Sequence, residues 1–459
     1  MEQDKKSFFG RIWYSIVRSP VYPGTDRERK WAAFENLIFH VHPRKVPEQT
    51  LKFTLTWGLG GMSLVLVLLQ VLTGILLLFV YEPSPDQAYR SILSLQNDIP
   101  FGQFIRNIHH WSANILVIVV FFHLLRVFFT GAFHNIRQFN WIIGLFLFFC
   151  VLLSNFTGYL LPWDQLAFWA ITICTSMVEY IPFVGHWLQK LMRGGAEIGS
   201  VTLSIFFALH IAVTPVFLLS LLPFHFWRVR KAGGVVMPRL SNESSEKKIE
   251  YVSTIPNLIL REAIVALVLV AFVFMYSVLF NAPLEAQANP GMSPNPAKAP
   301  WYFLGIQELL LHFHPLFAVV IIPFSLIVMS FLLPYLKYDM QVPGIWFISE
   351  KGRQMGRVSA VVAVIFTSLL IVIDEFMIDF ASWMPGLPTE ITNGLIPFFI
   401  VVAALYSFYK IIQRRYNASN AETFQSLITF LTVSFFILTA VGIWFRGEGM
   451  ALSWPWNLI

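Results

Sequence analysis

Hydrophobic side chains in this chain gather into long runs, separated by shorter stretches that hold most of the charged residues. Each run is close to the ~20 residues that an α-helix needs to cross a lipid bilayer. Nine runs are expected to be transmembrane helices: 52–81, 112–133, 139–161, 200–227, 258–280, 316–336, 357–378, 394–412 and 424–445. The pattern therefore predicts an all-α polytopic membrane protein.

The runs divide the chain into four parts. A polar, basic N-terminal segment, expected to be cytoplasmic and interfacial, precedes a four-helix bundle, a cytoplasmic linker and a C-terminal domain of about five more helices. These parts are assigned to residues 1–50, 51–230, 231–257 and 258–459. Residues 8–17 suit a helix at the membrane surface.

Two connections between helices are long. The connection over 281–315 is rich in proline, alanine and asparagine, and loops of that length are often functional. The connection over 162–199 holds the segment Gln165–Tyr180, which is predicted to form a helix along the membrane surface.

Composition supports this class, because 56% of the residues are hydrophobic and only 13% are charged. Lys and Arg concentrate in the N-terminal segment and in the connections after the fourth, sixth and eighth helices, which places all four in the cytoplasm. Nine crossings then leave the C-terminus outside a membrane of the bacterial inner-membrane type. The net charge of +6 indicates topology and attraction to anionic lipid, and gives no support for nucleic-acid binding.

Four of the predicted helices repeat one interval of 14 or 15 residues. The pairs are Gly60 with Gly74, His109 with His123, Gly144 with Gly158, and His210 with His225, the last at 15 residues. Fourteen residues of helix rise about 21 Å and complete nearly four turns, so both members of a pair face the same way. Two helices thus offer an imidazole at two depths, which suits two stacked haems, each held by two histidines.

The direction of the helices determines which histidines share a haem. The second and fourth helices both run inward from outside, so His109 and His210 are outer and His123 and His225 are inner. We therefore expect two non-covalent b-type haems, one on each pair. An isolated histidine in a membrane helix often bonds a neighbouring helix, but two pairs at matched spacing favour the haem hypothesis.

Residues beside the histidines extend this hypothesis. The four glycines would let a porphyrin edge approach the backbone, although glycines in membrane helices also serve helix packing. Arg106 and Arg126 each lie three residues from a predicted ligand and would bind haem propionates; the alternative is that they only set topology. Cys150 and Cys174 belong to no paired motif and are expected to be packing residues.

These residues resemble the cytochrome b family of quinol:cytochrome c and quinol:plastocyanin reductases. The resemblance is carried by IRNIHHWSANILVIVVFFHLLRVFFTG, FTGYLLPWDQLAFWA and FFALHIAVTPVFLLSLLPFHFWRVRKAGG, with APWYFLGIQELL in the long outer connection. The P-W-D-Q form, the 15-residue interval and Pro215 are similar to cytochrome b6. The second half resembles subunit IV of the same complex, fused to the first.

The resemblance implies a subunit of a quinol oxidoreductase similar to respiratory complex III. Quinol would be oxidised near the outer face, with one electron passing to a Rieske iron–sulfur protein and the other through the outer and inner haems to an inner quinone site. The implied partners are the Rieske protein, c-type cytochrome subunits and a second copy of the chain. The outer quinol pocket would hold Tyr159, Pro162, Trp163, Asp164, Trp301 and Tyr302.

Three features depart from the family pattern. Pro300 stands where the P-E-W-Y motif has its Glu, which is thought to accept a quinol proton. Glu308 is the nearest carboxylate and a candidate for that base, with His312 and His314 as further candidates; the alternative is that Glu308 is a solvated loop residue. Gly58 replaces the Cys that holds a covalent third haem, so no third haem is expected. The ninth helix exceeds the usual eight.

Two other classes of function are weighed against this one. A haem-bearing membrane anchor would pass electrons between quinone and a peripheral dehydrogenase or reductase without splitting the electron pair, and the altered P-E-W-Y motif keeps this alternative open. A transporter without redox groups does not account for the histidine spacing. The sequence does not name the quinone or the terminal acceptor. Arg230 and Lys231 match basic positions of the inner quinone site, but basic residues are also expected there because the connection is cytoplasmic.

Overall fold

A computed structural model of the chain describes residues 42–43, 45–238, 249–339 and 344–454. The predicted surface helix over 8–17 and part of the predicted linker lie outside these ranges. Within the described residues, nine helices are long and apolar enough to cross a membrane. The predicted all-α polytopic architecture is therefore confirmed.

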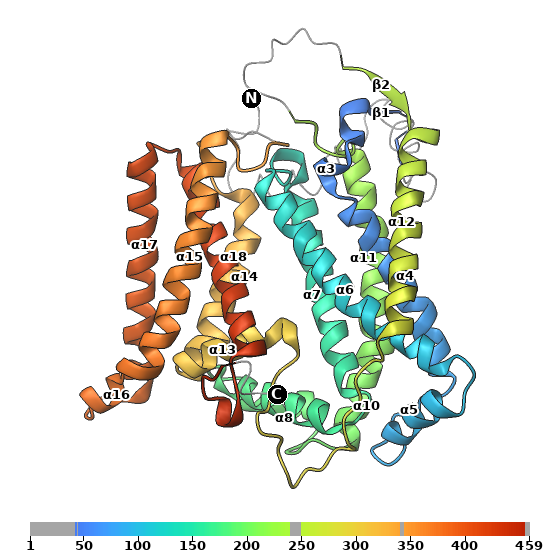
Figure 1. Cartoon of the computed structure of the whole chain (residues 1–459), viewed down its shortest axis with the longest axis vertical. Coiled ribbons are helices and arrows are strands. Elements are labelled where there is room, and N and C mark those ends of the chain that lie inside the picture. The colour runs from blue at the N-terminus through green and yellow to red at the C-terminus, as the bar shows by residue number, and fades with distance from the viewer. Residues whose placement is uncertain (1–41, 44, 239–248, 340–343, 455–459) are drawn as a thin grey trace.

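The nine spans cross the molecule along the vertical direction of Figure 1. They are α4 (Leu59–Leu78), α6 (Gly102–Phe129), α7 (Gln138–Leu160), α10–η5–α11 (Ser200–Ala208, Leu209–Val213, Thr214–Lys231), α12 (Thr254–Leu279), η7–α14 (Leu316–Ile321, Ile322–Leu332), α15 (Glu350–Met377), η9–α17 (Ile391–Leu395, Ile396–Tyr416) and α18 (Asn420–Trp444).

The first five spans form one group. α4 packs along α6, α7 packs along α11, and α12 covers α4 and α6. Their shared core consists of buried aliphatic side chains, among them Leu66, Leu116, Ile143 and Val151. Lipid tails are as apolar as these side chains, so close van der Waals packing, rather than exclusion of water, holds the four histidine- and glycine-bearing helices together.

The remaining spans form a second group, on the other side of Figure 1. α18 packs against α15, α17 and the short helix α13 (Leu304–His312). The indole N–H of Trp141 on α7 donates to the carbonyl of Ser330 on α14 at 2.8 Å and joins the two groups.

Short elements cap both ends of the spans. α5 (Ala88–Asn97), α8 (Gln165–Met177), α13 and the end of α18 lie at one face, which we call the α8 face, and the strands β1 (Lys45–Pro47) and β2 (Tyr251–Ser253) pair antiparallel at the other (Figure 1). The predicted helix over Gln165–Tyr180 is α8 with the 3₁₀ turn η4 (Val178–Tyr180). The other short elements are η2 (Glu48–Leu51), α3 (Phe53–Thr56), η3 (Asn135–Arg137), α9 (Gly185–Arg193), η6 (Trp301–Phe303), η8 (Leu333–Tyr335), α16 (Phe380–Trp383) and η10 (Glu448–Met450).

Three predicted span starts were wrong, those of α4, α6 and α15, and the first two have a clear structural cause. The second span begins at Gly102 and not at residue 112, because its first turns carry polar side chains that lower the hydropathy. Two of those side chains, Arg106 and Asn107, are buried and bonded, and Asn107 donates to the Ser277 carbonyl at 2.9 Å. The first span begins at Leu59, because Trp57 and Gly58 have positive φ (52° and 65°) and interrupt the helix.

Candidate functional site

The outer histidines lie opposite one another between α6 and the π-helical turn η5. The ring centroids of His109 and His210 are 6.1 Å apart, and the ring planes meet at 75°. Two imidazoles that bind one metal ion from opposite sides, through bonds of about 2 Å, have centroids about 6 Å apart. The spacing of this pair therefore fits two axial ligands of one iron.

Hydrogen bonds orient both outer rings. The Thr73 hydroxyl donates to the Leu69 carbonyl at 2.6 Å, so it accepts from Nδ1 of His109, 2.9 Å away. Nδ1 of His210 donates to the Ser154 carbonyl at 2.9 Å. Each ring therefore keeps its lone pair on Nε2, the nitrogen that is left for a metal ion.

The 15-residue interval between His210 and His225 has a structural cause. Residues Leu209–Val213 form the π-helical turn η5 inside the span. A single π turn adds one residue to an α-helix, so the longer interval keeps His210 and His225 on the same side of the helix. Pro215 follows this turn at the start of α11, where its missing N–H removes one α-helical hydrogen bond.

The four glycines lie directly against the four histidines. A Cβ atom placed on each glycine would come close to the Cε1 atom of one ring: Gly74 to His109 at 3.3 Å, Gly158 to His210 at 2.5 Å, Gly60 to His123 at 3.4 Å and Gly144 to His225 at 3.6 Å. The backbones of α4 and α7 therefore form a cradle around the imidazoles, which bulkier residues would fill.

The inner histidines line a cavity of about 950 Å³, together with Gly60, Gly144 and Arg126. The Nε atom of Arg126 donates to the Leu55 carbonyl at 3.0 Å, whereas its buried Nη2 atom has no hydrogen-bond partner among the residues that the structure describes. A buried guanidinium nitrogen requires an acceptor, and a carboxylate is its best match. The imidazole donors, the glycine cradle and this nitrogen together fit a haem with a propionate.

Arg106 lies at the level of the outer histidines and is buried. Its Nη1 and Nη2 atoms donate to the carbonyls of Ala282 and Pro283 at 2.8 and 2.6 Å. These bonds fix the start of the 281–315 connection to α6. A propionate contact for Arg106 stays a prediction beside this structural role.

The residues predicted for the outer quinol pocket come from two connections that pair with each other. After Pro162 and the buried Trp163, the Oδ1 atom of Asp164 accepts from the Ala167 N–H at 2.9 Å and caps α8. Its Oδ2 atom accepts from the Glu285 N–H at 3.1 Å. Burial raises the pKa of Asp164 above its ordinary value.

Trp301 and Tyr302 bring the second connection against the core of the bundle. The indole N–H of Trp301 donates to the side-chain oxygen of Asn114 at 2.6 Å. Within the described part of the chain, the buried hydroxyl of Tyr302 has no hydrogen-bond partner. Burial raises the pKa of Tyr302 above its ordinary value, with a smaller contribution from Tyr159. A buried hydroxyl of this kind is suited to meet a polar group of a ligand.

Glu308 is fully buried, so the alternative of a solvated loop residue is wrong. Both of its oxygens accept from Arg446, whose Nη2 atom lies 2.6 Å from Oε1, and Nε2 of His312 lies 3.3 Å from the same oxygen. Burial alone would raise the pKa of Glu308, but the hydrogen bonds from His312 and Arg446 hold it below its ordinary value.

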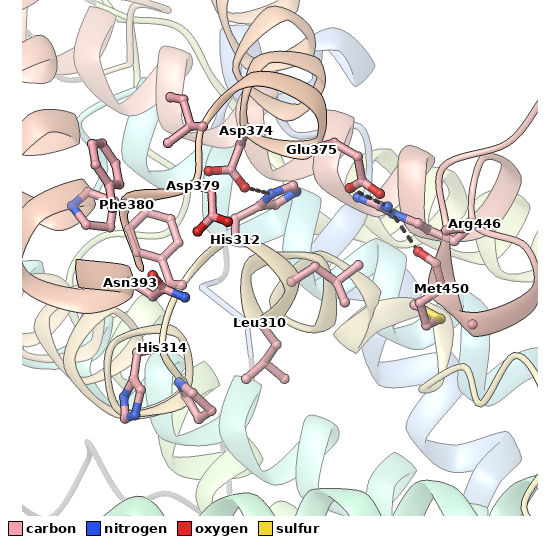
Figure 2. Close-up of a pocket in the computed structure, with 17 residues that line it drawn as sticks. Leu310, His312, His314, Asp374, Glu375, Asp379, Phe380, Asn393, Arg446 and Met450 are labelled. Carbon is pink, nitrogen blue, oxygen red and sulfur yellow. Dashed lines mark hydrogen bonds and ion pairs between the residues drawn. The ribbon is translucent and has the colours of Figure 1, made fainter. Parts of the chain in front are cut away.

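His312 also contacts a second carboxylate (Figure 2). Its Nδ1 atom lies 2.6 Å from Asp374 Oδ2, at the edge of a cavity of about 610 Å³ that Glu375 and Arg446 also line. Burial would lower the pKa of His312, but the two carboxylates raise it to about 9. Asp374, Glu375 and Arg446 were not predicted from the sequence. The only local sign of them is the acidic pair Asp374–Glu375 at the end of an apolar run.

Sequence comparisons agree with these observations. The family model described as "Cytochrome b/b6/petB" matches residues 46–233. A cytochrome b6 from Heliomicrobium gestii is 41% identical over 206 residues, which are 45% of this chain and 96% of that protein. A menaquinol:cytochrome c reductase cytochrome b subunit from Bacillus subtilis (strain 168) is 41% identical over 38% of this chain and 78% of that protein.

One relative and one solved structure extend into the C-terminal half. A cytochrome bc complex cytochrome b subunit from Chlorobaculum thiosulfatiphilum is 33% identical over 62% of this chain and 66% of that protein. A chain of a hyperthermophilic respiratory complex III shares the fold with a TM-score of 0.62 at 22% identity, over 91% of this chain and 96% of that one. The chain belongs to the cytochrome b/b6 family, as its histidine and glycine motifs predicted.

Proposed function

We propose that the chain is the dihaem cytochrome b subunit of a bc-type quinol oxidoreductase, which oxidises quinol near the α8 face and carries electrons across the membrane to an inner quinone site. The observation that carries this proposal is the pairing of four histidines at two depths, each against a glycine. Relatives named as cytochrome b subunits of menaquinol:cytochrome c reductases support an oxidoreductase complex, and make a menaquinol the first substrate to test.

The chain's own residues perform three tasks in this proposal. His109 with His210 and His123 with His225 would hold one haem each, and the bound haems supply one-electron redox chemistry at two depths. The glycine cradle keeps the backbone out of the space that each ring system needs. Arg126 would bind a propionate of the inner haem through its Nη2 atom.

The outer quinol pocket is proposed from Tyr159, Pro162, Trp163, Asp164, Trp301 and Tyr302. The unpartnered Tyr302 hydroxyl would bond a quinol oxygen, and the pairing of the 164 and 287 regions would shape the pocket wall. Glu308 is proposed as the carboxylate that takes up a quinol proton, in place of the absent P-E-W-Y glutamate.

The α8 face is proposed to be the outer face of a bacterial inner membrane, with the N-terminal end of the chain in the cytoplasm. The Lys- and Arg-rich connections on the opposite side support this orientation. A Rieske iron–sulfur protein, a c-type cytochrome and a second copy of the chain are the proposed partners.

A reduced-minus-oxidised spectrum of the purified complex, with pyridine haemochrome quantification, tests the proposal. We expect two b-type haems per chain and two redox steps. Copurification of a Rieske protein with a c-type cytochrome is expected, whereas a peripheral dehydrogenase or reductase alone would support the membrane-anchor alternative. A spectrum without haem would contradict both.

The hydrogen bond from His109 to Thr73 gives a smaller, separate prediction. Thr73→Val removes the acceptor of Nδ1, and we expect the outer haem to bind about 10–100-fold more weakly, because such second partners typically contribute that much. Haem titration of the complex measures this. The matched control is Thr157→Val, because Thr157 lies 3.4 Å from Nδ1 of His210, whose carbonyl partner at 2.9 Å remains. Equal affinities in the two variants would contradict the prediction.

A further inference from the structure

Three ionisable side chains on α13 and α15 form a continuous hydrogen-bonded row. His312 stands in the middle, with Nε2 3.3 Å from Glu308 and Nδ1 2.6 Å from Asp374. The exposed fraction of the side chains rises along the row, from 0% for Glu308 through 9% for His312 to 33% for Asp374. The row therefore leads from the protein interior to a wetter site.

The exposed end of the row opens into the cavity of about 610 Å³ at the α8 face (Figure 2). Asp374 points into this cavity, and Asp379 and His314 also line it. The lining residues come from the ends of α13, α15 and α18 and from the start of the α17 span. A proton that reaches Asp374 has therefore reached the cavity at the α8 face.

Arg446 stabilises the buried end of the row. It is 1% exposed, bonds both oxygens of Glu308, and donates through Nη1 to Glu375 at 2.9 Å and to the Met450 carbonyl at 3.0 Å. Because Glu375 also pairs with Arg446, the arginine keeps a counter-charge when Glu308 becomes neutral. A buried cation without this second partner would be costly.

We propose that Glu308, His312 and Asp374 form a proton-exit relay for quinol oxidation, with Arg446, just beyond the ninth span, as its fixed counter-ion. This inference rests on the proposed function, because oxidation of a quinol releases two protons along with two electrons. Histidine suits the central place, since its two ring nitrogens can accept and release protons on opposite sides. The relay also gives the C-terminal span a role, because that span brings Arg446 to Glu308.

Each transfer moves one proton and no electrons. A quinol O–H bond breaks and an O–H bond forms on Glu308. The His312 imidazolium releases its Nδ1 proton to Asp374, which passes it to water in the cavity. The neutral ring then turns to present its free nitrogen to Glu308, accepts that proton and returns to the imidazolium form, so one proton has entered and one has left.

The charged groups around His312 set the expected pH dependence. Glu308 faces it from α13 and Asp374 from α15, while Arg446 and Glu375 contact the row from α18 and α15. These carboxylates keep the ring protonated until the pH approaches about 9. The rate of proton acceptance should therefore rise with pH and level off near pH 9, where the ring becomes neutral.

The test uses the intact complex with menadiol and decylubiquinol as quinols, and follows the rate of haem reduction from pH 6 to pH 10. We expect His312→Gln to lower the rate about 100-fold, a typical contribution of general acid–base transfer, and to abolish the levelling near pH 9. Asp374→Asn should lower the rate about tenfold. The matched control is Asp379→Asn, because Asp379 lines the same cavity but caps α16 and does not bond His312.

Haem content and size-exclusion profiles show whether each variant is folded. If His312→Gln does not assemble, the rate of the Asp374→Asn variant tests the relay instead. That variant is expected to fold, because position 374 is partly exposed and an asparagine amide can still bond the His312 ring. Wild-type rates in either folded variant would overturn the relay while leaving the proposed function intact. A wild-type complex that oxidises neither quinol would instead contradict the proposed function, and the relay with it.

Discussion

Replacing His123 with alanine should remove the inner haem and leave the outer haem in place. His123 and His225 face the same inner cavity, so the change would remove one of the two residues proposed to hold the inner haem. The outer pair lies about 21 Å away along the helix axis and has its own hydrogen bonds to Thr73 and Ser154. Nothing at the outer level depends on His123.

Pyridine haemochrome quantification of the purified variant should therefore give one haem per chain, and a redox titration should show one b-type step. The control is His134→Gln, because His134 lies in the loop after α6, contacts Phe133 at a ring-centroid distance of 4.2 Å and is not among the residues that line the inner cavity. That variant should keep both haems. Loss of both haems from folded His123→Ala protein would contradict the proposed pairing of the histidines. Retention of both haems would show that His123 is not needed to hold a haem.

The sequence predicted the spans and the approach of His109 to His210 because both depend on local patterns. A run of apolar residues identifies a membrane helix without knowledge of its neighbours. The helical repeat likewise places His109 above His123 on one face, and the direction of the spans pairs each with its partner. The structure brings those residues together as this reasoning expected.

Features that depend on distant residues or on backbone irregularity could not be predicted in the same way. Arg446 meets Glu308 across 138 positions of the chain, and no local pattern links them. The start of α6 has low hydropathy, yet Arg106 and Asn107 in it are buried, because the connection after α12 supplies acceptors for both side chains. In the sequence, the π turn at His210 is visible only as one extra residue between His210 and His225. That this residue forms a π turn could be seen only in the structure.

Gly158→Ala should cost the protein its outer haem, whereas Gly144→Ala should be tolerated. A methyl group on residue 158 would lie 2.5 Å from Cε1, 3.0 Å from Nδ1 and 3.2 Å from Nε2 of His210, so it would overlap the whole edge of the ring. At residue 144 the nearest ring atom of His225 would be 3.6 Å away, which is an ordinary van der Waals contact. The two glycines form one 14-residue pair on α7, so the sequence treats them alike, yet the space beside each of them differs.

The His210 ring has little freedom to move away from an alanine at position 158. Its Nδ1 atom donates to the Ser154 carbonyl on the same helix as Gly158, so a shift of the ring would break that bond and would also turn Nε2 away from the haem that it is proposed to hold. We therefore expect haemochrome analysis to find one haem per chain in Gly158→Ala and two in Gly144→Ala, with equal yields of folded protein. Two haems in Gly158→Ala would mean that the ring is not held where the cradle places it, since a fixed imidazole and a new methyl group cannot occupy the same space.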